Sequence, residues 1–248
     1  SSDYTSSTSL QSSTKLATGS THLSANANLV WGWYDNPSNS LCRFSPRTAK
    51  DTLPSLFSRN LIFIGDGMIK SLFHSFSRVL LNDDQANGHY DATIPKHSDI
   101  TKYFDSVKIQ YKWAPLAMDQ LENLRELREY KDDGGPDIVI LGGGAWDRLH
   151  VWATDEDQDS LKATIIKLTK EMEKLKRTGV PVIWMIPTTI NTKALNQEEK
   201  RTQMSEEAVQ QMRDLYASLG VLGASTFVLD GRVFTQQRVE ESFDGMHY

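Results

Sequence analysis

The most informative pattern of hydrophobic and polar positions lies between residues 59 and 81. Residues 61–64 form a continuous apolar run of β-prone side chains, and from Ile69 to Leu80 apolar residues recur at the spacing of one helix face. The turn Gly65-Asp66-Gly67 joins the two parts. A strand that passes through such a turn into a helix places the turn residues at a helix N-terminus, where a reactive side chain or an anion is readily held. An ordinary connection between a strand and a helix has the same pattern, so this stretch alone leaves both interpretations open.

The same reasoning predicts the rest of the fold. Residues 106–113 alternate between apolar and polar, which indicates a half-exposed strand near a sheet edge, whereas residues 137–141 are uniformly apolar, as in a parallel strand covered on both faces. Residues 82–99 are polar and predict a loop with solvated histidines at His89 and His97. In all we predict five strands, at residues 61–64, 106–113, 137–141, 180–186 and 226–230, and four helices, at residues 68–81, 116–130, 157–178 and 198–219. Their alternation predicts an α/β protein, a three-layer α/β/α sandwich around a mainly parallel, five-stranded sheet.

The N-terminal part has a different composition. Residues 1–28 are rich in Ser, Thr, Ala and Asn and have too few large apolar side chains to offset the cost of ordering the backbone, which predicts a tail or stalk. We therefore expect one domain over residues 29–248. It opens on an aromatic cluster at residues 29–34, which either packs onto the domain or offers a surface for stacking carbohydrate.

Composition and charge narrow the classes of function. The 248 residues are 39% hydrophobic and 24% charged, which fits one substantial α/β domain. A net charge of −5 leaves no basic field, so we expect no nucleic-acid partner. No apolar run is long enough to cross a bilayer, so any membrane attachment is expected through segments outside this sequence. The single cysteine, Cys42, is either a free thiol, a small buried residue, or the partner of a cysteine elsewhere.

The chain ends on a second candidate for chemistry. Asp244 and His247 lie three residues apart in a loop that contains Gly245. This spacing can place both side chains on one side of a turn, where the carboxylate orients the imidazole as a general base.

Three separate blocks of sequence carry a resemblance to a known superfamily. They are the strand and turn that end at Gly65-Asp66, the segment from Ile138 to Trp146, and the Asp244-Gly245-x-His247 loop. Together they resemble the SGNH (GDSL-like) hydrolases, in which a Gly-Asp-Ser supplies the nucleophile and a late Asp-x-x-His supplies the base. Within that superfamily the blocks look like the luminal catalytic domain of the sialate and fungal capsule-polysaccharide O-acetyltransferases, over about residues 30 to 248.

The resemblance implies an activity and its surroundings. It implies transfer of an acetyl group, from acetyl-CoA or another donor as co-substrate, through an acyl-serine to the hydroxyl of a glycan or nucleotide-sugar. It implies no bound cofactor and no metal, a place in the secretory pathway in the Golgi lumen, and a further helix after Tyr248. A nucleotide-binding interpretation of the Gly65-Asp66-Gly67 turn is weaker, because the chain has neither a Walker A lysine pattern nor Gly-x-Gly-x-x-Gly.

One departure from the family pattern matters most. The nucleophile position is Gly67, which has no side-chain oxygen and so cannot form an acyl-enzyme. Either this is an inactive form with the nucleophile replaced, or a natural member that has lost the covalent step; the retained Asp244 and His247 favour the first. The alternatives to a transferase are a carbohydrate acetyl-esterase and a catalytically inactive carbohydrate-binding domain.

The remaining candidate residues follow from the same resemblance. Many SGNH hydrolases have an oxyanion-stabilising Asn where this chain has Gly144, so backbone N–H groups of Gly142, Gly143 and Gly144 are candidates to replace it; a plain tight turn is equally compatible. Three more residues are expected on the substrate side: Asp66, Trp113 and Trp146, with core packing as the alternative for Trp113. Because sites in such sheets lie at the carboxyl ends of the strands, all of these are expected at one edge.

Overall fold

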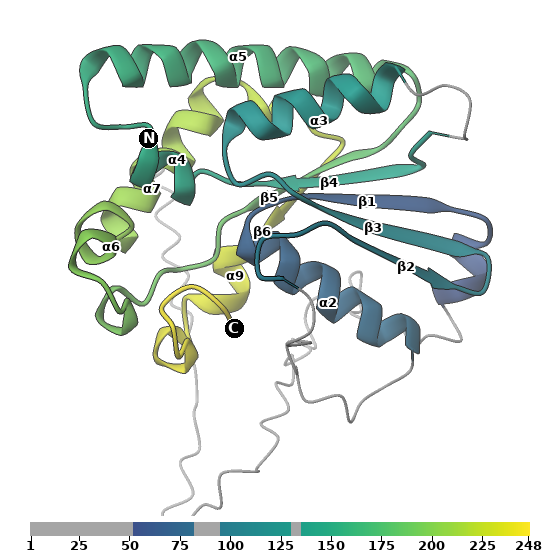
Figure 1. Ribbon diagram of the computed structural model, residues 1–248, viewed down its shortest axis with the longest axis horizontal. Helices are drawn as coiled ribbons and strands as arrows, with labels where there is room; N and C mark the ends of the chain where they lie inside the picture. Colours follow the sequence, from purple (N-terminus) through teal and green to yellow (C-terminus); the bar gives the residue numbers. More distant parts are fainter. Residues whose placement is uncertain (1–51, 82–94, 130–134) are drawn as a thin grey trace, which may run out of the picture. The chain divides into compact units, whose positions relative to one another are not determined.

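A six-stranded sheet forms the centre of the computed structural model, which describes residues 52–81, 95–129 and 135–248 (Figure 1). The strands lie in the order β2-β3-β1-β4-β5-β6, and only the β2–β3 pair is antiparallel. Their bounds are β1 Asn60–Gly65, β2 Ile100–Phe104, β3 Val107–Trp113, β4 Ile138–Gly142, β5 Val182–Ile186 and β6 Phe227–Asp230. The predicted α/β class and mainly parallel sheet are therefore confirmed.

The predicted number of five strands is wrong, because β2 was missed. This edge strand pairs with β3, from Ile100 against Tyr111 to Phe104 against Val107, across a turn at Asp105, where φ is 51°. Ile100 is the one residue of β2 that is buried, so the strand lacks the continuous apolar run that marks the central strands.

Helices fill every connection between the strands except the turn from β2 to β3. Their bounds are α2 Gly67–Leu81, α3 Ala117–Glu129, α4 Ala145–His150, α5 Asp155–Arg177, α6 Glu198–Gln203, α7 Glu206–Ser218, α8 Val221–Ala224 and α9 Gly231–Thr235, with 3₁₀ turns at Leu53–Leu56, Thr192–Ala194 and Val239–Glu241. The single helix predicted over residues 198–219 is wrong: it breaks at Met204, and Ser205 caps a new helix by accepting a hydrogen bond from the N–H of Ala208 at 3.2 Å. The helical pattern on both sides of the break concealed it, since Ser is compatible with either a cap or a helix interior.

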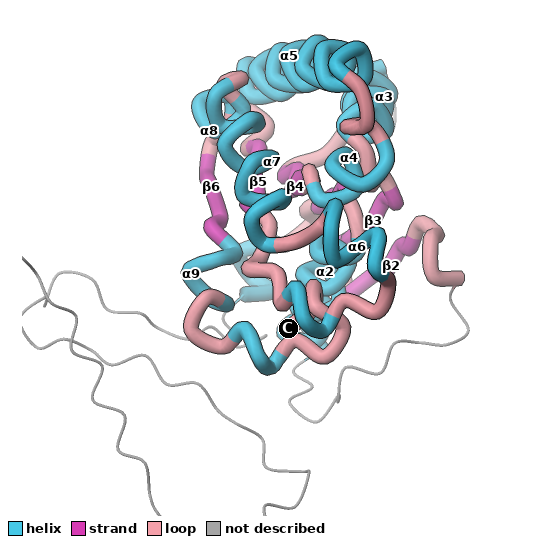
Figure 2. Tube along the Cα trace, turned by 90° about the vertical axis from the view of Figure 1, so that its left-hand side faces the viewer, coloured by secondary structure: helices cyan, strands magenta, loops and turns pink. Residues whose placement is uncertain are grey.

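Both faces of the sheet are covered by helices. Along β1, Leu61 and Phe63 belong to the core under α2, whereas Ile62 and Ile64 belong to the core under α3 and α5. Figures 1 and 2 show α3 and α5 together on one side and α2 on the other. This double coverage explains why the central parallel strands read as continuous apolar runs.

The register of the parallel strands brings their carboxyl ends to one edge. Gly65 of β1 lies opposite Trp113 of β3 and opposite Gly142 of β4, and Gly142 lies opposite Met185 of β5. A Cβ on Gly65 would be 2.5 Å from the Ile69 side chain and 2.6 Å from the Gly142 carbonyl oxygen. Only glycine permits this close approach of α2 to the strand ends.

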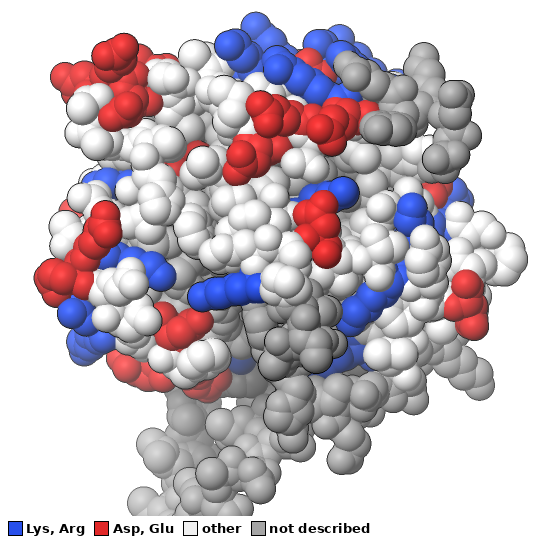
Figure 3. Space-filling model, in the orientation of Figure 1, with Lys and Arg blue, Asp and Glu red and all other residues white. Residues whose placement is uncertain are grey.

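Several predictions concern residues outside the described ranges: the tail at residues 1–28, the aromatic cluster at residues 29–34, Cys42 and His89. Within the described ranges, no helix combines the length and apolarity needed to cross a bilayer. Figure 3 shows acidic and basic side chains interspersed over the face in view, with no broad area of a single charge.

Phe73 offers a test of the core under α2. Its side chain is fully buried and contacts the rings of Phe63 and Tyr111, at centroid distances of 5.6 and 5.9 Å. We expect Phe73→Ala to lower the free energy of unfolding by about 3–5 kcal/mol, since it removes a large buried ring and leaves a cavity. Val79→Ala on the same helix is the matched control, because Val79 is 39% exposed and its truncation should change stability by about 0.5 kcal/mol at most. Urea unfolding of the three proteins decides; equal losses for the two variants would contradict this account of the core.

Candidate active site

The residue at the predicted nucleophile position begins helix α2. Gly67 follows β1 after one intervening residue and is not among the glycines with positive φ, which are Gly144, Gly179, Gly220 and Gly245. An L-residue such as serine is therefore compatible with the backbone at position 67. In the first turn of this helix, the Met68 N–H donates to the Asp66 carboxylate and the Lys70 N–H to the Asp66 carbonyl oxygen.

Asp244 and His247 form a hydrogen-bonded pair, as their spacing predicts. The Asp244 Oδ2 atom lies 2.5 Å from the His247 Nδ1 atom, and Asp244 Oδ1 accepts hydrogen bonds from the backbone N–H groups of Met246 and His247, both at 3.0 Å. Gly245 permits this turn: its φ is 91°, and a Cβ there would be 2.8 Å from the carbonyl oxygen of Asn191. The carboxylate thus fixes both the backbone and the imidazole of its own loop.

The imidazole of His247 lies directly against Gly67. A Cβ built on Gly67 would be 2.6 Å from His247 Nε2 and 3.2 Å from Cε1. Ordinary contacts between non-bonded atoms begin near 3.5 Å, so a side chain at position 67 requires the ring to shift by about 1 Å. Since the ring is the far end of a rotatable side chain, that shift leaves Nε2 within hydrogen-bond reach of a serine hydroxyl.

The pair perturbs the acidity of both partners. For His247, burial acts to lower the pKa, but the hydrogen bond and charge of Asp244 outweigh it, and the pKa is raised above its ordinary value. For Asp244, burial acts to raise the pKa, but the hydrogen bonds from His247 and the Met246 N–H hold it well below its ordinary range. Asp244 is therefore ionised at neutral pH and stabilises the imidazolium that general-base catalysis would generate.

Asp66 lies beside Gly67, but its carboxylate does not face a substrate. The residue is 1% exposed, Oδ1 accepts a hydrogen bond from the N–H of Met68 at 2.9 Å, and Oδ2 has no hydrogen-bond partner among the described residues. Burial raises the pKa of Asp66 to about 6. The predicted placement of Asp66 on the substrate side is therefore corrected: its side chain caps α2 from below the surface.

The glycine turn after β4 lies at the same edge. A Cβ on Gly143 would be 2.5 Å from the Gln120 side-chain nitrogen, and Gly144 has a φ of 114° and precedes α4. Gln120 donates to the carbonyl oxygens of Ala114 and Gly142, at 3.2 and 3.0 Å, and so ties the ends of β3 and β4 together. The turn therefore requires glycine at these positions for close packing and for a positive φ. A role of Gly142, Gly143 and Gly144 as oxyanion donors stays a prediction.

A buried acid behind this turn was not predicted. Asp147 of α4 is fully buried and accepts hydrogen bonds from the Ala117 N–H at 3.0 Å and the Tyr216 hydroxyl at 2.7 Å. Burial raises the pKa of Asp147 to about 6 and that of Tyr216 well above its ordinary value. No local sequence pattern predicts this pair, because Asp147 and Tyr216 lie 69 positions apart.

Two tryptophans and two histidines form an aromatic cluster near the strand ends. His97 stacks on Trp113 with ring centroids 4.2 Å apart and an interplanar angle of 14°, Trp113 meets Trp146 edge to face at 5.5 Å, and Trp146 contacts His150 at 5.2 Å. Both tryptophans are half-buried and both histidines are exposed. Trp113 and Trp146 pack on the core under α2 with part of their surface and leave the rest accessible, so both predicted roles of Trp113 remain compatible with its position.

The charges around His97 are basic. Partial burial, together with the positive charges of Lys96, Lys70 and Lys200, lowers the pKa of His97 below its ordinary value. The imidazole is therefore neutral at pH 7, which suits its stacking on an indole ring.

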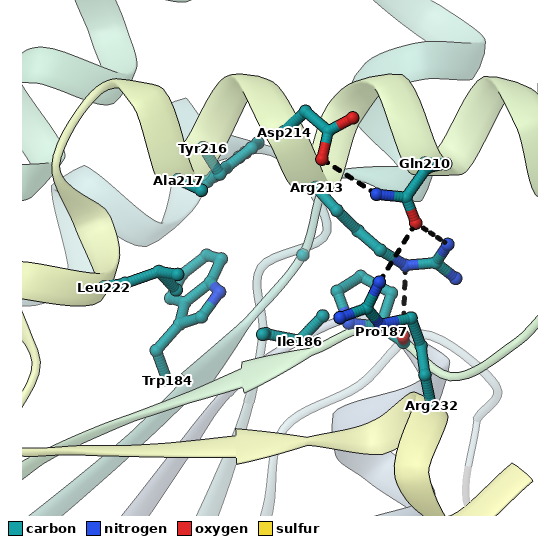
Figure 4. Close-up of a pocket in the computed structure, with 11 residues that line it drawn as sticks. Trp184, Ile186, Pro187, Gln210, Arg213, Asp214, Tyr216, Ala217, Leu222 and Arg232 are labelled. Atoms are coloured by element: carbon teal, nitrogen blue, oxygen red, sulfur yellow. Dashed lines mark hydrogen bonds between the residues drawn. The ribbon is translucent and has the colours of Figure 1, made fainter. Parts of the chain in front are cut away.

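A cavity of about 90 Å³ lies between β5 and α7, with Trp184 and Pro187 on one side, Gln210 and Arg213 of α7 on the other, and Arg232 entering from α9 (Figure 4). Neither Asp244 nor His247 lines it. Within the described ranges, no group of three His, Cys, Asp or Glu side chains is arranged to hold a metal ion.

Comparisons with known proteins give distant similarity. No family profile matches the chain. The protein ALTERED XYLOGLUCAN 9 of Arabidopsis thaliana is 26% identical over 241 residues, which cover 88% of this chain and 64% of that protein. The N-acetylneuraminate (7)9-O-acetyltransferase of Danio rerio is 22% identical over 197 residues, which cover 77% of this chain and 24% of that protein. The chain therefore spans less than two thirds of either relative.

Solved structures give a weaker likeness. An acetylxylan esterase from Geobacillus stearothermophilus has a TM-score of 0.43 and 14% sequence identity, over 77% of this chain and 87% of that one, and a catalytic mutant of that esterase gives the same values. A likeness of this size carries no inference about activity.

The buried carboxyl of Asp66 predicts a pH dependence of stability. Its pKa is about 6 in the folded chain against an ordinary 3.8, so the folded state keeps a proton that the unfolded state has released. The contribution of the Asp66 carboxyl to the free energy of unfolding therefore falls by roughly 2–3 kcal/mol as the pH rises from about 4 to 6, and it stays constant above that. Asp66→Asn lacks this titration, so we expect its free energy of unfolding to gain that amount relative to the parent chain between pH 4 and pH 7. Chemical denaturation at both pH values tests this, and a difference that stays constant with pH would refute it.

Proposed function

We propose that this chain is the catalytic domain of an SGNH-type O-acetyltransferase that moves an acetyl group from an activated donor to a sugar hydroxyl, and that Gly67 leaves this form without its nucleophile. The observation that carries the proposal is the position of His247: its Nε2 atom lies against residue 67, and its Nδ1 atom is held by Asp244. A side-chain hydroxyl at position 67 would complete a nucleophile, base and carboxylate in the order that acyl transfer requires.

With serine at position 67 the chemistry takes two steps. His247 Nε2 accepts the proton of the serine hydroxyl while the serine oxygen attacks the acetyl carbonyl carbon. The imidazolium then protonates the leaving group of the donor, which is a thiolate if the donor is acetyl-CoA. In the second step the neutral His247 takes the proton of the acceptor hydroxyl while the acceptor oxygen attacks the acetyl carbonyl carbon. The bond between that carbon and the serine oxygen then breaks, and the imidazolium returns the proton to the serine oxygen. General-base assistance of this kind contributes about 10²- to 10⁴-fold, and each well-placed oxyanion donor about 3 kcal/mol. In this proposal the backbone N–H groups of residue 67 and Gly143 are the donors.

The names of the relatives support a sugar as acceptor. One relative is named as an O-acetyltransferase of N-acetylneuraminate and the other for altered xyloglucan. The acceptor class we propose is accordingly a glycan or nucleotide-sugar, with acetyl-CoA or another acetyl donor as co-substrate. On the resemblance to the luminal domains of the O-acetyltransferases, we also propose a place in the secretory pathway, in the Golgi lumen.

We place the acceptor on the cluster formed by Trp113, Trp146, His97 and His150. Trp113 and Trp146 flank the end of β1 from β3 and from α4, so a sugar ring lying on them is beside residue 67. Partly exposed indole rings provide a large, rigid apolar contact for a sugar face at low entropic cost.

Gly67 favours one alternative, a carbohydrate-binding domain without catalysis. Loss of the nucleophile removes the covalent step but leaves the aromatic surface intact. A carbohydrate acetyl-esterase is the second alternative, since the same residues hydrolyse an ester if water replaces the sugar hydroxyl.

The proposal is tested by restoring the hydroxyl. We expect Gly67→Ser to acquire an acetyl adduct at residue 67 when treated with an activated acetyl donor, measured by mass spectrometry of the intact protein and its peptides. The double variant Gly67→Ser/His247→Ala should lose the reaction by at least about 100-fold, since the hydroxyl loses its general base. Gly67→Ala is the matched control for the ring shift without a hydroxyl.

The outcomes separate the candidate functions. Turnover with a sugar acceptor supports the transferase, and release of acetate with or without the sugar supports the esterase. If the Gly67→Ser chain folds but is never acylated, and the parent chain binds a glycan, the result would reject the transferase in favour of the carbohydrate-binding domain.

The acceptor surface has its own prediction. In the Gly67→Ser chain, we expect Trp146→Ala to raise the KM for the sugar acceptor by about 2- to 10-fold, the range of one aromatic contact, and to leave acylation by the donor within twofold. Trp152→Ala is the matched control, because Trp152 packs on the opposite core, under α5. Steady-state kinetics with varied acceptor concentration measure the effect. Equal KM values for the two tryptophan variants would contradict the placement of the acceptor on Trp113 and Trp146.

A further inference from the structure

The loop that carries His247 is held by the segment that follows β5. Thr188 Oγ1 donates to the Met246 carbonyl oxygen at 3.1 Å, and the Asn191 N–H donates to the Gly245 carbonyl oxygen at 2.9 Å. The hydroxyl of Tyr248 donates in return to the Thr189 carbonyl oxygen at 2.8 Å. Every one of these bonds joins backbone or side chain of residues 188–191 to residues 245–248, so the height of the imidazole above residue 67 depends on where residues 188–191 lie.

That segment is in turn held by a charged pair on α7. Arg213 Nη2 donates to the Thr188 carbonyl oxygen at 2.5 Å, and Arg213 Nε donates to the Pro187 carbonyl oxygen at 3.3 Å. Figure 4 shows the second of these bonds, with the guanidinium lying between α7 and Pro187. Glu206 Oε2 accepts from the Ile190 N–H at 2.6 Å. Two side chains of one helix therefore hold the carbonyl groups of Pro187 and Thr188 and the N–H group of Ile190.

The two side chains depend on each other. Glu206 Oε1 lies 2.7 Å from Arg213 Nη1 and Oε2 lies 3.2 Å from Nη2. The Arg213 side chain is 3% exposed, so its charge has little access to water and is compensated by Glu206 and by the carbonyl oxygens it binds. A planar guanidinium can bind a carboxylate and two carbonyls at once, whereas an ammonium at the same place cannot reproduce that fork.

We infer that Arg213, with Glu206, is a positioning residue of the site. The pair fixes residues 187–190, and this segment sets the place of His247 over residue 67 through the hydrogen bonds of Thr188 and of the next residue, Asn191. The inference rests on the proposed function only in taking residue 67 as the reacting position. Arg213 touches neither His247 nor the space above Gly67, and it acts solely through the backbone that it binds.

A reactive thiol at position 67 reports the position of the imidazole without any need for turnover. In Gly67→Cys, a nearby His247 favours the thiolate, and we expect a thiol pKa below about 7.5 instead of the ordinary 8.5. Iodoacetamide reads this out: the thiolate attacks its carbon, the C–S bond forms and iodide leaves. The pH profile of the rate is followed by peptide mass spectrometry, which separates position 67 from Cys42.

Four further changes, each made in the Gly67→Cys chain, give the test. His247→Ala defines the profile without an imidazole. We expect Arg213→Lys to move the profile toward that of His247→Ala, with a loss of about tenfold in rate at pH 6.5, where the rate follows the thiolate fraction. Arg232→Lys is the matched control: Arg232 lies in the same cavity and binds Asp230 and Gln210, but it makes no hydrogen bond to residues 187–190. Thr188→Val removes the bond to the Met246 carbonyl oxygen, together with a longer contact of the same hydroxyl to the Met68 sulfur at 3.5 Å, and decides the question if Arg213→Lys does not fold.

Each outcome has a distinct meaning. A shift with Arg213→Lys or Thr188→Val, and none with Arg232→Lys, supports the inference. An unshifted profile in the folded Arg213 and Thr188 variants overturns it and leaves the proposed function standing, as does an equal shift with Arg232→Lys. If His247→Ala itself leaves the profile unchanged, His247 does not serve position 67, and the proposed function falls together with the inference.

Discussion

The arrangement depends on one packing constraint, the close approach of helix α2 to the ends of β1 and β4. Gly65 and Gly142 lie opposite each other, and a Cβ on either would come within 3 Å of Ile69 and of a neighbouring carbonyl oxygen. Because both are glycine, α2 can begin at residue 67, immediately beyond the sheet edge. The place of residue 67 is therefore set by backbone packing and owes nothing to its own side chain. This packing of α2 against the ends of β1 and β4 therefore does not change when residue 67 has no side chain.

Three carboxylates lie around this edge, and the hydrogen bonds each receives explain how they differ. Asp244 receives two backbone N–H bonds and an imidazole, and its pKa is lowered. Asp147 receives one N–H and one hydroxyl, whereas Asp66 receives one N–H and keeps an oxygen with no partner among the described residues; burial dominates in both, and each pKa rises to about 6. The site thus contains one permanent anion beside the imidazole and two acids whose charge is poorly supported.

The sequence predicted those parts of the fold and site that arise from local pattern. The α/β order, the strand and helix on either side of Gly67, and the contact of Asp244 with His247 all depend on residues close together in the chain, and the structure has them. What the sequence could not predict depends on distant partners. Strand β2 has one buried residue and exists because β3 offers it an edge, and Arg213 reads as an ordinary surface residue of an amphipathic helix until its carbonyl partners 25 and 26 positions earlier are known. The substrate-side placement of Asp66 was wrong for the same reason, since the sequence of the turn does not show that neighbouring elements bury its side chain.

The contact between His247 and Gly67 has a consequence for chemical complementation. Where truncation of a catalytic side chain leaves an empty space, a small alcohol or amine from solution can occupy it and restore part of the chemistry. Here the Nε2 atom lies 2.6 Å from where a Cβ would be, so the imidazole itself fills the space that a hydroxymethyl group would need. A free alcohol would have to displace a ring that a carboxylate holds at 2.5 Å, without the covalent tether that gives a side chain its advantage in doing so. The missing group of this protein is one that only the polypeptide can supply.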